Sequence, residues 1–291
     1  MESNRLVKII CLAISLIMAA LLLYYLYKSC GSGWGWSLWA YGIPAIPVGF
    51  SFYFALKKGD ERERIASCMA LLVVLVIFLN LPGAAYLLEE GIGPSDLAAK
   101  GEFDILLSSV TVFALFFIPS MAIVYVESEE MKNGLKRLGF KPERRLGSSI
   151  AWGLLLTIIT FMLVVLASTI MSLVASSLGY KIPMENPLAE RMSSSSLLII
   201  VLPILAGIGE EIFFRGILQS RFGIVVQAIV FGLAHVAYLI PQQVILPMVM
   251  AVLWGYAYKI TKDIRIVITS HIAYNFIAML TLHFLGDYLP I

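Results

Sequence analysis

Long apolar segments recur along the whole chain and limit the folds that it can adopt. Each run is about 18 to 25 residues long, and an α-helix of that length crosses a hydrocarbon core about 30 Å thick. Short polar segments separate the runs. There are nine, at approximately 9–27, 34–56, 65–88, 105–126, 149–178, 196–219, 222–239, 243–260 and 264–285.

The composition agrees with a membrane protein. Hydrophobic residues make up 60% of the 291 residues and charged residues only 14%, whereas soluble domains are about half apolar and about a quarter charged. We predict an all-α fold, a polytopic membrane helical bundle with eight to nine transmembrane helices; the eighth run is short and the fifth long. The lipid bilayer is an expected partner, and no nucleic acid is expected.

The basic residues predict the orientation of the chain in the membrane. If the N-terminus is cytoplasmic, 17 of the 21 Lys and Arg residues fall on the inner side and four on the outer side, as cytoplasmic loops require. The acidic loop 89–104 fits the outer side. We therefore expect a multi-pass protein of the cell membrane with a cytoplasmic N-terminus and, with nine spans, an external C-terminus. The first run, preceded by Arg5 and Lys8, is expected to be a retained signal anchor.

Three regions differ in their polar content. Residues 1–130 hold four apolar runs with almost no ionisable groups inside them, and their role is unknown. Residues 131–147 form a basic linker that is expected to be cytoplasmic. Residues 148–291 carry all three histidines of the chain. We expect the chemistry of the protein to lie in this last region.

Ionisable residues occur inside three of the later apolar runs. The sixth run contains "GIGEEIFFRG" at 207–216, the seventh contains "FGLAH" at 231–235, and the ninth contains "HIAYN" at 271–275. Such residues are costly inside a membrane and usually face the interior of a bundle or a water-filled cavity. A functional site is therefore the expectation here, although a single buried histidine or a Glu–Arg pair is more often structural.

Helical spacing separates the two glutamates of the sixth run. Glu211 and Arg215 are four residues apart and share a helix face, so we expect them to pair. Glu210 is turned by about 100° from that face and remains the freer carboxylate. A kink near Gly207 or Gly209 would reverse this assignment.

The depths of the polar residues converge. A tight turn near "SRFG" at 220–223 places Glu210 and His235 about 18 to 20 Å from the turn along their helices. From the start of the ninth run, His271 is about 12 Å deep and Asn275 about 18 Å deep. Phe231 shares a face with His235 and is expected to line the wall beside it. We predict one polar layer formed by three helices.

Two kinds of hydrolytic chemistry fit this layer. A carboxylate can act as general base toward water while an imidazole positions that water, and neutral donors can stabilise an oxyanion. Alternatively, Zn²⁺ could be held by Glu210, His235 and His271, leaving a position for water. The sequence contains no HExxH motif, so the usual zincin helix is not expected.

The three motifs, taken in order, resemble one known family. Glu210, Glu211 and Arg215 match its EExxxR pattern, Phe231 and His235 match FxxxH, and His271 and Asn275 match HxxxN. The chain thus resembles the CPBP family of intramembrane metalloproteases, which includes CAAX prenyl protease 2 and the bacteriocin-processing (ABI) proteins. The likeness covers approximately residues 147–285.

The resemblance implies an intramembrane endopeptidase that acts on membrane-anchored or lipidated substrates, including prenylated CAAX-type chains. It implies that Glu210 and His235 activate water, that His271 and Asn275 stabilise the oxyanion, and that Glu211 and Arg215 support the site. Either a metal or a glutamate alone could drive the reaction. Two alternatives are a non-enzymatic immunity or scaffold protein that retains the fold, and a proton-coupled transporter.

Overall fold

A computed structural model describes residues 60–285, except residues 90, 92, 100, 129, 142 and 181–185. The chain divides into two compact units, one made of residues 1–91 and 119–134 and the other of residues 92–118 and 135–291. All the motif residues lie in the second unit. Helix α5 contributes residues to both units, and the division falls at Pro119 inside it.

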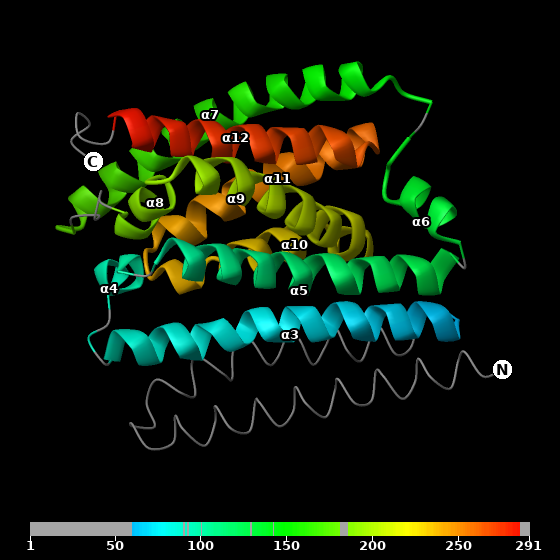
Figure 1. Cartoon of the computed structure of the whole chain (residues 1–291), viewed down its shortest axis with the longest axis horizontal. Coiled ribbons are helices and arrows are strands. Elements are labelled where there is room, and N and C mark those ends of the chain that lie inside the picture. Colours follow the sequence, from blue (N-terminus) through cyan, green and yellow to red (C-terminus); the bar gives the residue numbers. More distant parts are fainter. Residues whose placement is uncertain are drawn as a thin grey trace. The chain divides into compact units, whose positions relative to one another are not determined.

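The fold is all-α, as predicted, and every regular element among the described residues is a helix (Figure 1). Most of the long helices begin and end within a few residues of the predicted apolar runs. The elements are α3 (Glu61–Glu89), α4 (Pro94–Ala98), α5 (Glu102–Ser128), α6 (Met131–Arg137), α7 (Leu146–Ser177), α8 (Pro187–Met192), α9 (Ser196–Glu211), the π-helix η1 (Ile212–Leu218), α10 (Gln219–Leu233), the 3-10 helix η2 (Val236–Tyr238), α11 (Gln242–Thr261) and α12 (Ile264–Leu285).

Five helical segments in the described part of the chain are long and apolar enough to cross a membrane. They are 102–128, 146–177, 196–233, 242–261 and 264–284, which makes the protein a multi-pass membrane protein. The segment 196–233 contains two of the predicted spans, which a kink at Gly223 separates. The expected spans 9–27 and 34–56, with the expected signal anchor, lie outside the described residues.

Gly223 reverses the chain inside α10, four residues after that helix begins. On one straight helix Phe214 and Phe231 would be about 25 Å apart, yet their ring centroids are 4.9 Å apart. The reversal occurs at Gly223, whose backbone has φ 80° and ψ 176°, a conformation that side-chain-bearing residues rarely adopt. The predicted turn is thus confirmed, and α10 packs back on η1.

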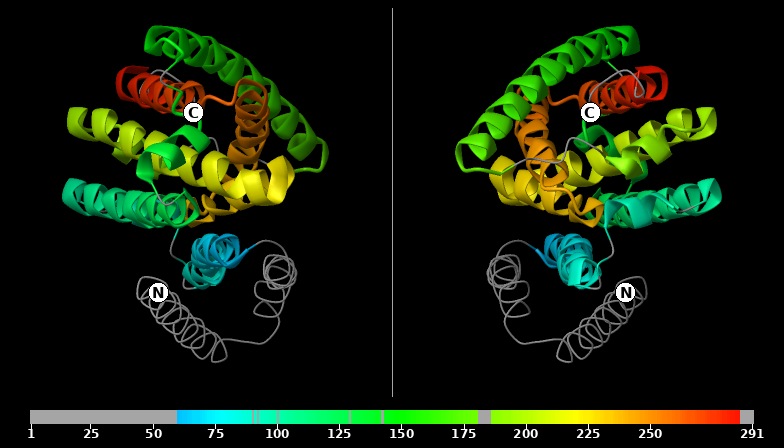
Figure 2. Two further views of the ribbon diagram at one scale, coloured as in Figure 1. Left: turned by 90° about the vertical axis from the view of Figure 1, so that its right-hand side faces the viewer. Right: turned by 90° about the vertical axis from the view of Figure 1, so that its left-hand side faces the viewer.

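The second unit is a layered bundle in which the helices that carry the motifs are neighbours. Helix α12 packs against α7 on one side and α9 on another, and α10 packs against α11. Figure 2 shows α7 and α12 next to each other in both of its views. Buried apolar side chains from α5, α9 and α12 form one cluster in this unit, namely Ile105, Leu198, Ile199, Leu202 and Met279.

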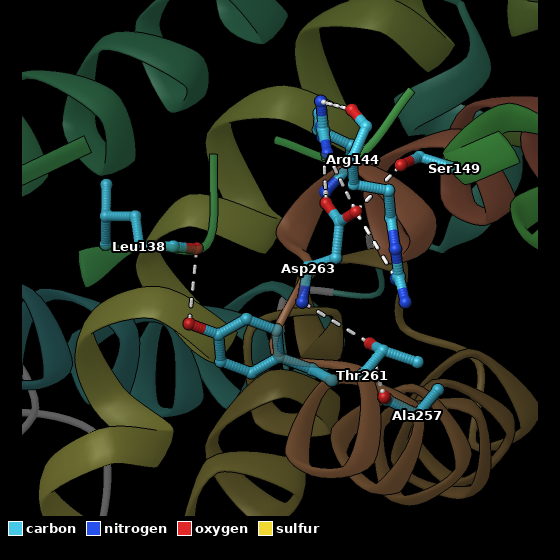
Figure 3. Close-up of polar contacts among 8 residues, drawn as sticks. Leu138, Arg144, Ser149, Ala257, Thr261 and Asp263 are labelled. Carbon is cyan, nitrogen blue, oxygen red and sulfur yellow. Dashed lines mark hydrogen bonds and ion pairs between the residues drawn. The ribbon is translucent and has the colours of Figure 1, made fainter. Parts of the chain in front are cut away.

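A buried carboxylate joins the linker to the turn between α11 and α12 (Figure 3). Ser149 donates a hydrogen bond of 2.7 Å to Oδ2 of Asp263, and Arg265 donates to both oxygens at 2.9 Å. Arg144 lies 3.5 Å from the same Oδ2. Asp263 Oδ1 also accepts from the backbone N–H of Arg265, which caps the start of α12.

These partners decide the charge state of Asp263. Burial alone would raise the pKa of its carboxyl, but the hydrogen bonds from Arg265 and Ser149 and the charge of Arg265 outweigh burial and hold the pKa below its ordinary value. Because the folded pKa is lower than the unfolded one, the ionised carboxylate stabilises the fold above about pH 4, and this contribution disappears as the pH falls further.

We therefore expect Asp263→Asn to destabilise the protein at neutral pH. The loss should be about 1.5–3 kcal/mol, the usual range for hydrogen bonds to charged groups. Urea unfolding of wild type and variant in detergent, at pH 7 and again below about pH 4, measures it. The difference should shrink in acid, and an equal difference at both pH values would contradict the assignment.

Candidate active site

A π-helix carries the last residue of the first motif, Arg215, while Glu210 and Glu211 end α9. Residues Ile212–Leu218 continue α9 with wider turns, a feature that the spacing argument did not anticipate. Such segments are rare and frequently occur at functional sites. The predicted ion pair is nevertheless present, because Nε of Arg215 lies 2.9 Å from Oε2 of Glu211. Both side chains are fully buried.

Glu211 also contacts the third motif. Its Oε1 lies 2.7 Å from Nδ1 of His271 on α12, so an ionised Glu211 accepts a hydrogen bond from that ring nitrogen. Arg215, Glu211 and His271 thus form one buried chain across two helices. Sequence reasoning paired Glu211 with Arg215 but did not connect it to His271. The bond fixes the tautomer of His271 and leaves Nε2 as its second functional atom.

Aromatic rings surround the guanidinium of Arg215. Its Cζ lies 4.5 Å from the ring centroid of Phe231 and 5.4 Å from that of Trp254. Neither Nη1 nor Nη2 has a hydrogen-bond partner, and the contact of Nε with Glu211 lacks hydrogen-bond geometry. Cation–π attraction therefore replaces part of the lost hydration. Arg215 is one of the 17 basic residues assigned to the inner side; the structure shows it fully buried, and its side of the membrane stays a prediction.

His235 lies at the end of α10, in a turn rather than within the predicted span. Its Nδ1 is 2.8 Å from the carbonyl oxygen of Phe231, the residue one helical turn earlier. Only a protonated Nδ1 can donate to a carbonyl, so Nε2 of a neutral ring is an acceptor. The rings of Phe231 and His235 are 4.9 Å apart, which confirms that Phe231 lies beside the histidine.

Glu210 is the carboxylate outside the buried ion pair. Its Oε2 is buried and has no hydrogen-bond partner. Its charge acts on His235 and Tyr238, so the three side chains lie within electrostatic range of one another. The predicted division between Glu211 as the paired glutamate and Glu210 as the freer one is confirmed.

Asn275 follows His271 by about one turn on α12 and is partly buried. No interaction among the described residues connects it to His271, His235 or Glu210. The predicted Zn²⁺ ligands are Glu210, His235 and His271, but no three His, Cys, Asp or Glu side chains in the described part of the chain form a metal-binding group. The residues as arranged do not fit a three-ligand zinc site, and bound Zn²⁺ stays a prediction that metal analysis of the purified protein can test.

Two aromatic residues near the site were missed by the sequence analysis. Trp254 of α11 is fully buried, and its ring centroid lies 4.7 Å from that of His271. Tyr238 stacks on His235 with ring centroids 6.0 Å apart. The position of Trp254 was an available signal, since tryptophan in membrane helices is enriched at the interfaces rather than in the middle of a span.

A close helix contact beside the site depends on Gly207. A Cβ at this position of α9 would lie 2.5 Å from Cγ1 of Ile272 and 3.2 Å from its backbone nitrogen. Ile272 follows His271 directly, so the absence of a side chain at Gly207 allows α9 to approach α12 closely enough for Glu211 to reach His271.

Gly207→Ala should therefore separate α9 from α12. We expect a destabilisation of about 1–3 kcal/mol from overpacking and a loss of activity of about tenfold or more from misplacement of His271. Gly147→Ala in α7 is the matched control, because nothing lies within 4 Å of its added Cβ. Thermal unfolding and a cleavage assay on both variants check this, and wild-type behaviour of Gly207→Ala would refute the close contact.

A comparison with known families agrees with this geometry. Residues 192–277 match the family described as type II CAAX prenyl endopeptidase Rce1-like, and this segment contains every residue of the three motifs. No curated protein and no solved structure matches the chain. The motif residues lie in membrane-spanning helices or, for His235, at the end of one, and the Rce1-like family implies protease activity in general. The Rce1-like match is limited to residues 192–277 and agrees with the resemblance found in the motifs.

Proposed function

We propose that the protein is an intramembrane endopeptidase that hydrolyses a peptide bond of a membrane-anchored substrate, with prenylated CAAX-type chains as the first class to test. The observation that carries the proposal is the division of labour between two adjacent glutamates. Glu211 is held by Arg215 and His271, whereas Glu210 keeps a buried oxygen without a hydrogen-bond partner and lies within electrostatic range of His235.

In the proposed mechanism Glu210 takes a proton from a water molecule that Nε2 of His235 helps to position. The water oxygen bonds to the carbonyl carbon of the substrate, and the carbonyl oxygen becomes an oxyanion. When the C–N bond breaks, Glu210 returns the proton to the leaving amine. The overall reaction consumes one water and yields a new carboxylate and a new amine.

We assign the stabilisation of this oxyanion to His271 and Asn275. In this step the His271 ring is protonated on both nitrogens. Its Nε2–H donates to the oxyanion while its Nδ1–H stays bonded to Glu211, and the negative charge of Glu211 compensates the positive charge of the imidazolium. The amide of Asn275 is the second donor. Within this mechanism Glu211 and Arg215 orient His271 and take no proton from the substrate.

The proposal is tested by incubating purified protein in lipid nanodiscs with prenylated, acylated and unmodified versions of one membrane-anchored peptide. We expect cleavage of at least one version and a preference among the lipid groups. An immunity or scaffold protein would cleave none of them, and a transporter would instead move solute in response to a pH gradient.

A further inference from the structure

One buried indole contacts two of the polar side chains of the site, Arg215 and His271, without belonging to any motif. Trp254 of α11 is fully buried. Its ring centroid is 4.7 Å from that of His271 on α12, with the planes 32° apart, and 5.4 Å from Cζ of Arg215 on η1. It also lies 6.5 Å from the ring of Phe231 on α10. Trp254 therefore contacts all three helices that carry the motifs.

A hydrogen bond from a fourth helix fixes the orientation of this indole. Nε1 of Trp254 donates to Oγ1 of Thr160 on α7 at 2.9 Å. The hydroxyl of Thr160 donates its own proton to the carbonyl oxygen of Leu156 at 2.8 Å. Because a hydroxyl has one proton and its lone pairs remain as acceptors, the two bonds run in a single direction and reinforce each other.

His271 needs such a contact because its bond to Glu211 holds only one end of the ring. A histidine that is bonded through Nδ1 can still change the plane of its ring, and Nε2 moves when it does. The face of Trp254 limits that motion. The same indole covers the guanidinium of Arg215, whose Nη atoms have no hydrogen-bond partner, and so keeps water away from the ion pair with Glu211.

We propose that Trp254, held by Thr160, is a positioning residue that sets the plane of the His271 imidazole. This inference deepens the proposed function and rests on it for the kinetic readout alone. It gives α7, which carries none of the motif residues, a role at the active site. The expected defect is in kcat rather than KM, since Trp254 acts on a group that stabilises the transition state.

Two substitutions of Thr160 separate positioning from packing. Thr160→Val keeps the shape of threonine but removes the acceptor for Trp254, whereas Thr160→Ser keeps the hydroxyl and loses a methyl group. If the hydrogen bond matters, kcat should fall about tenfold in Thr160→Val and stay near the wild-type value in Thr160→Ser, with KM unchanged in both. If only packing matters, kcat should instead fall in Thr160→Ser and stay near the wild-type value in Thr160→Val.

Thr169→Val is the matched control in the same helix. Its hydroxyl also donates a hydrogen bond to the carbonyl oxygen one turn earlier, that of Val165, at 2.9 Å. Unlike Thr160, Thr169 is exposed and lies away from Trp254. Wild-type kcat is expected for this variant. A loss in Thr169→Val equal to that in Thr160→Val would overturn the inference, because it would assign the effect to α7 in general.

A second readout does not depend on activity. The chain has three histidines, so ¹³C-labelled histidine gives three side-chain signals, which His271→Gln and His283→Gln assign. Thr160→Val should shift the His271 signal, because the ring current of Trp254 changes, and leave that of His283 in place. An unmoved His271 signal would refute the inference even if the wild type cleaves its substrate. A shifted signal in a protein that cleaves nothing would support the geometry and refute the proposed function.

Discussion

Glu210→Gln should slow peptide cleavage by orders of magnitude while leaving the fold intact. Glutamine keeps the size of the side chain but cannot take a proton from water, and general base catalysis contributes about 10²- to 10⁴-fold to rates. We expect kcat to fall by that amount. Thermal stability should be unchanged or slightly higher, because Glu210 takes no part in the ion pair of Glu211 with Arg215 and its buried Oε2 has no hydrogen-bond partner.

The measurement is single-turnover cleavage of a membrane-anchored peptide, with thermal unfolding of the same preparation. His235→Gln is the companion variant, and it should lower kcat without unfolding the protein. A Glu210→Gln protein that retains its fold and cleaves at the wild-type rate would remove Glu210 from the reaction and favour a scaffold or immunity role for the chain.

The neighbouring substitution, Glu211→Gln, should have the opposite phenotype. It leaves the fully buried guanidinium of Arg215 without a counter-charge, and breaking a buried ion pair in this way costs about 3–5 kcal/mol. We expect a large drop in the midpoint of unfolding and poor recovery of the protein from membranes. Activity should fall as well, since His271 loses the acceptor of its Nδ1 proton.

A double substitution separates these two effects. In Glu211→Gln with Arg215→Met both charges of the buried ion pair are removed, so much of the stability should return, as it does when buried ion pairs are replaced by apolar groups. Activity should stay low because His271 is still unsupported. If the single Glu211→Gln variant is as stable as the wild type, the ion pair contributes nothing to the fold and its assigned role is wrong.

Local spacing was enough to predict some of the site. The pairing of Glu211 with Arg215 follows from their four-residue separation, and the place of Phe231 beside His235 follows in the same way. The reversal at Gly223 was also predictable, because glycine tolerates positive φ and a polar segment separates two apolar runs there. Each of these features is set by residues close together in the chain.

Contacts between distant segments could not be predicted in this way. The bond between Glu211 and His271 joins residues 60 positions apart, and periodicity says which face a residue occupies but not which helix covers that face. The place of Trp254 in the middle of its run is unusual for a tryptophan, but its contacts with α7 and α12 could not be predicted from that position. The π-helix of η1 has no sequence signal that we recognise.

Water labelled with ¹⁸O tests the central claim most directly. The purified wild-type protein is incubated in nanodiscs with a membrane-anchored peptide in H₂¹⁸O, and the products are weighed by mass spectrometry beside those of Glu210→Gln. We predict two fragments, with one ¹⁸O in the new C-terminal carboxylate, and intact peptide with the variant. Peptide that stays whole with the wild type, or identical fragments from Glu210→Gln at the same rate, would contradict a protease that uses Glu210 to activate water.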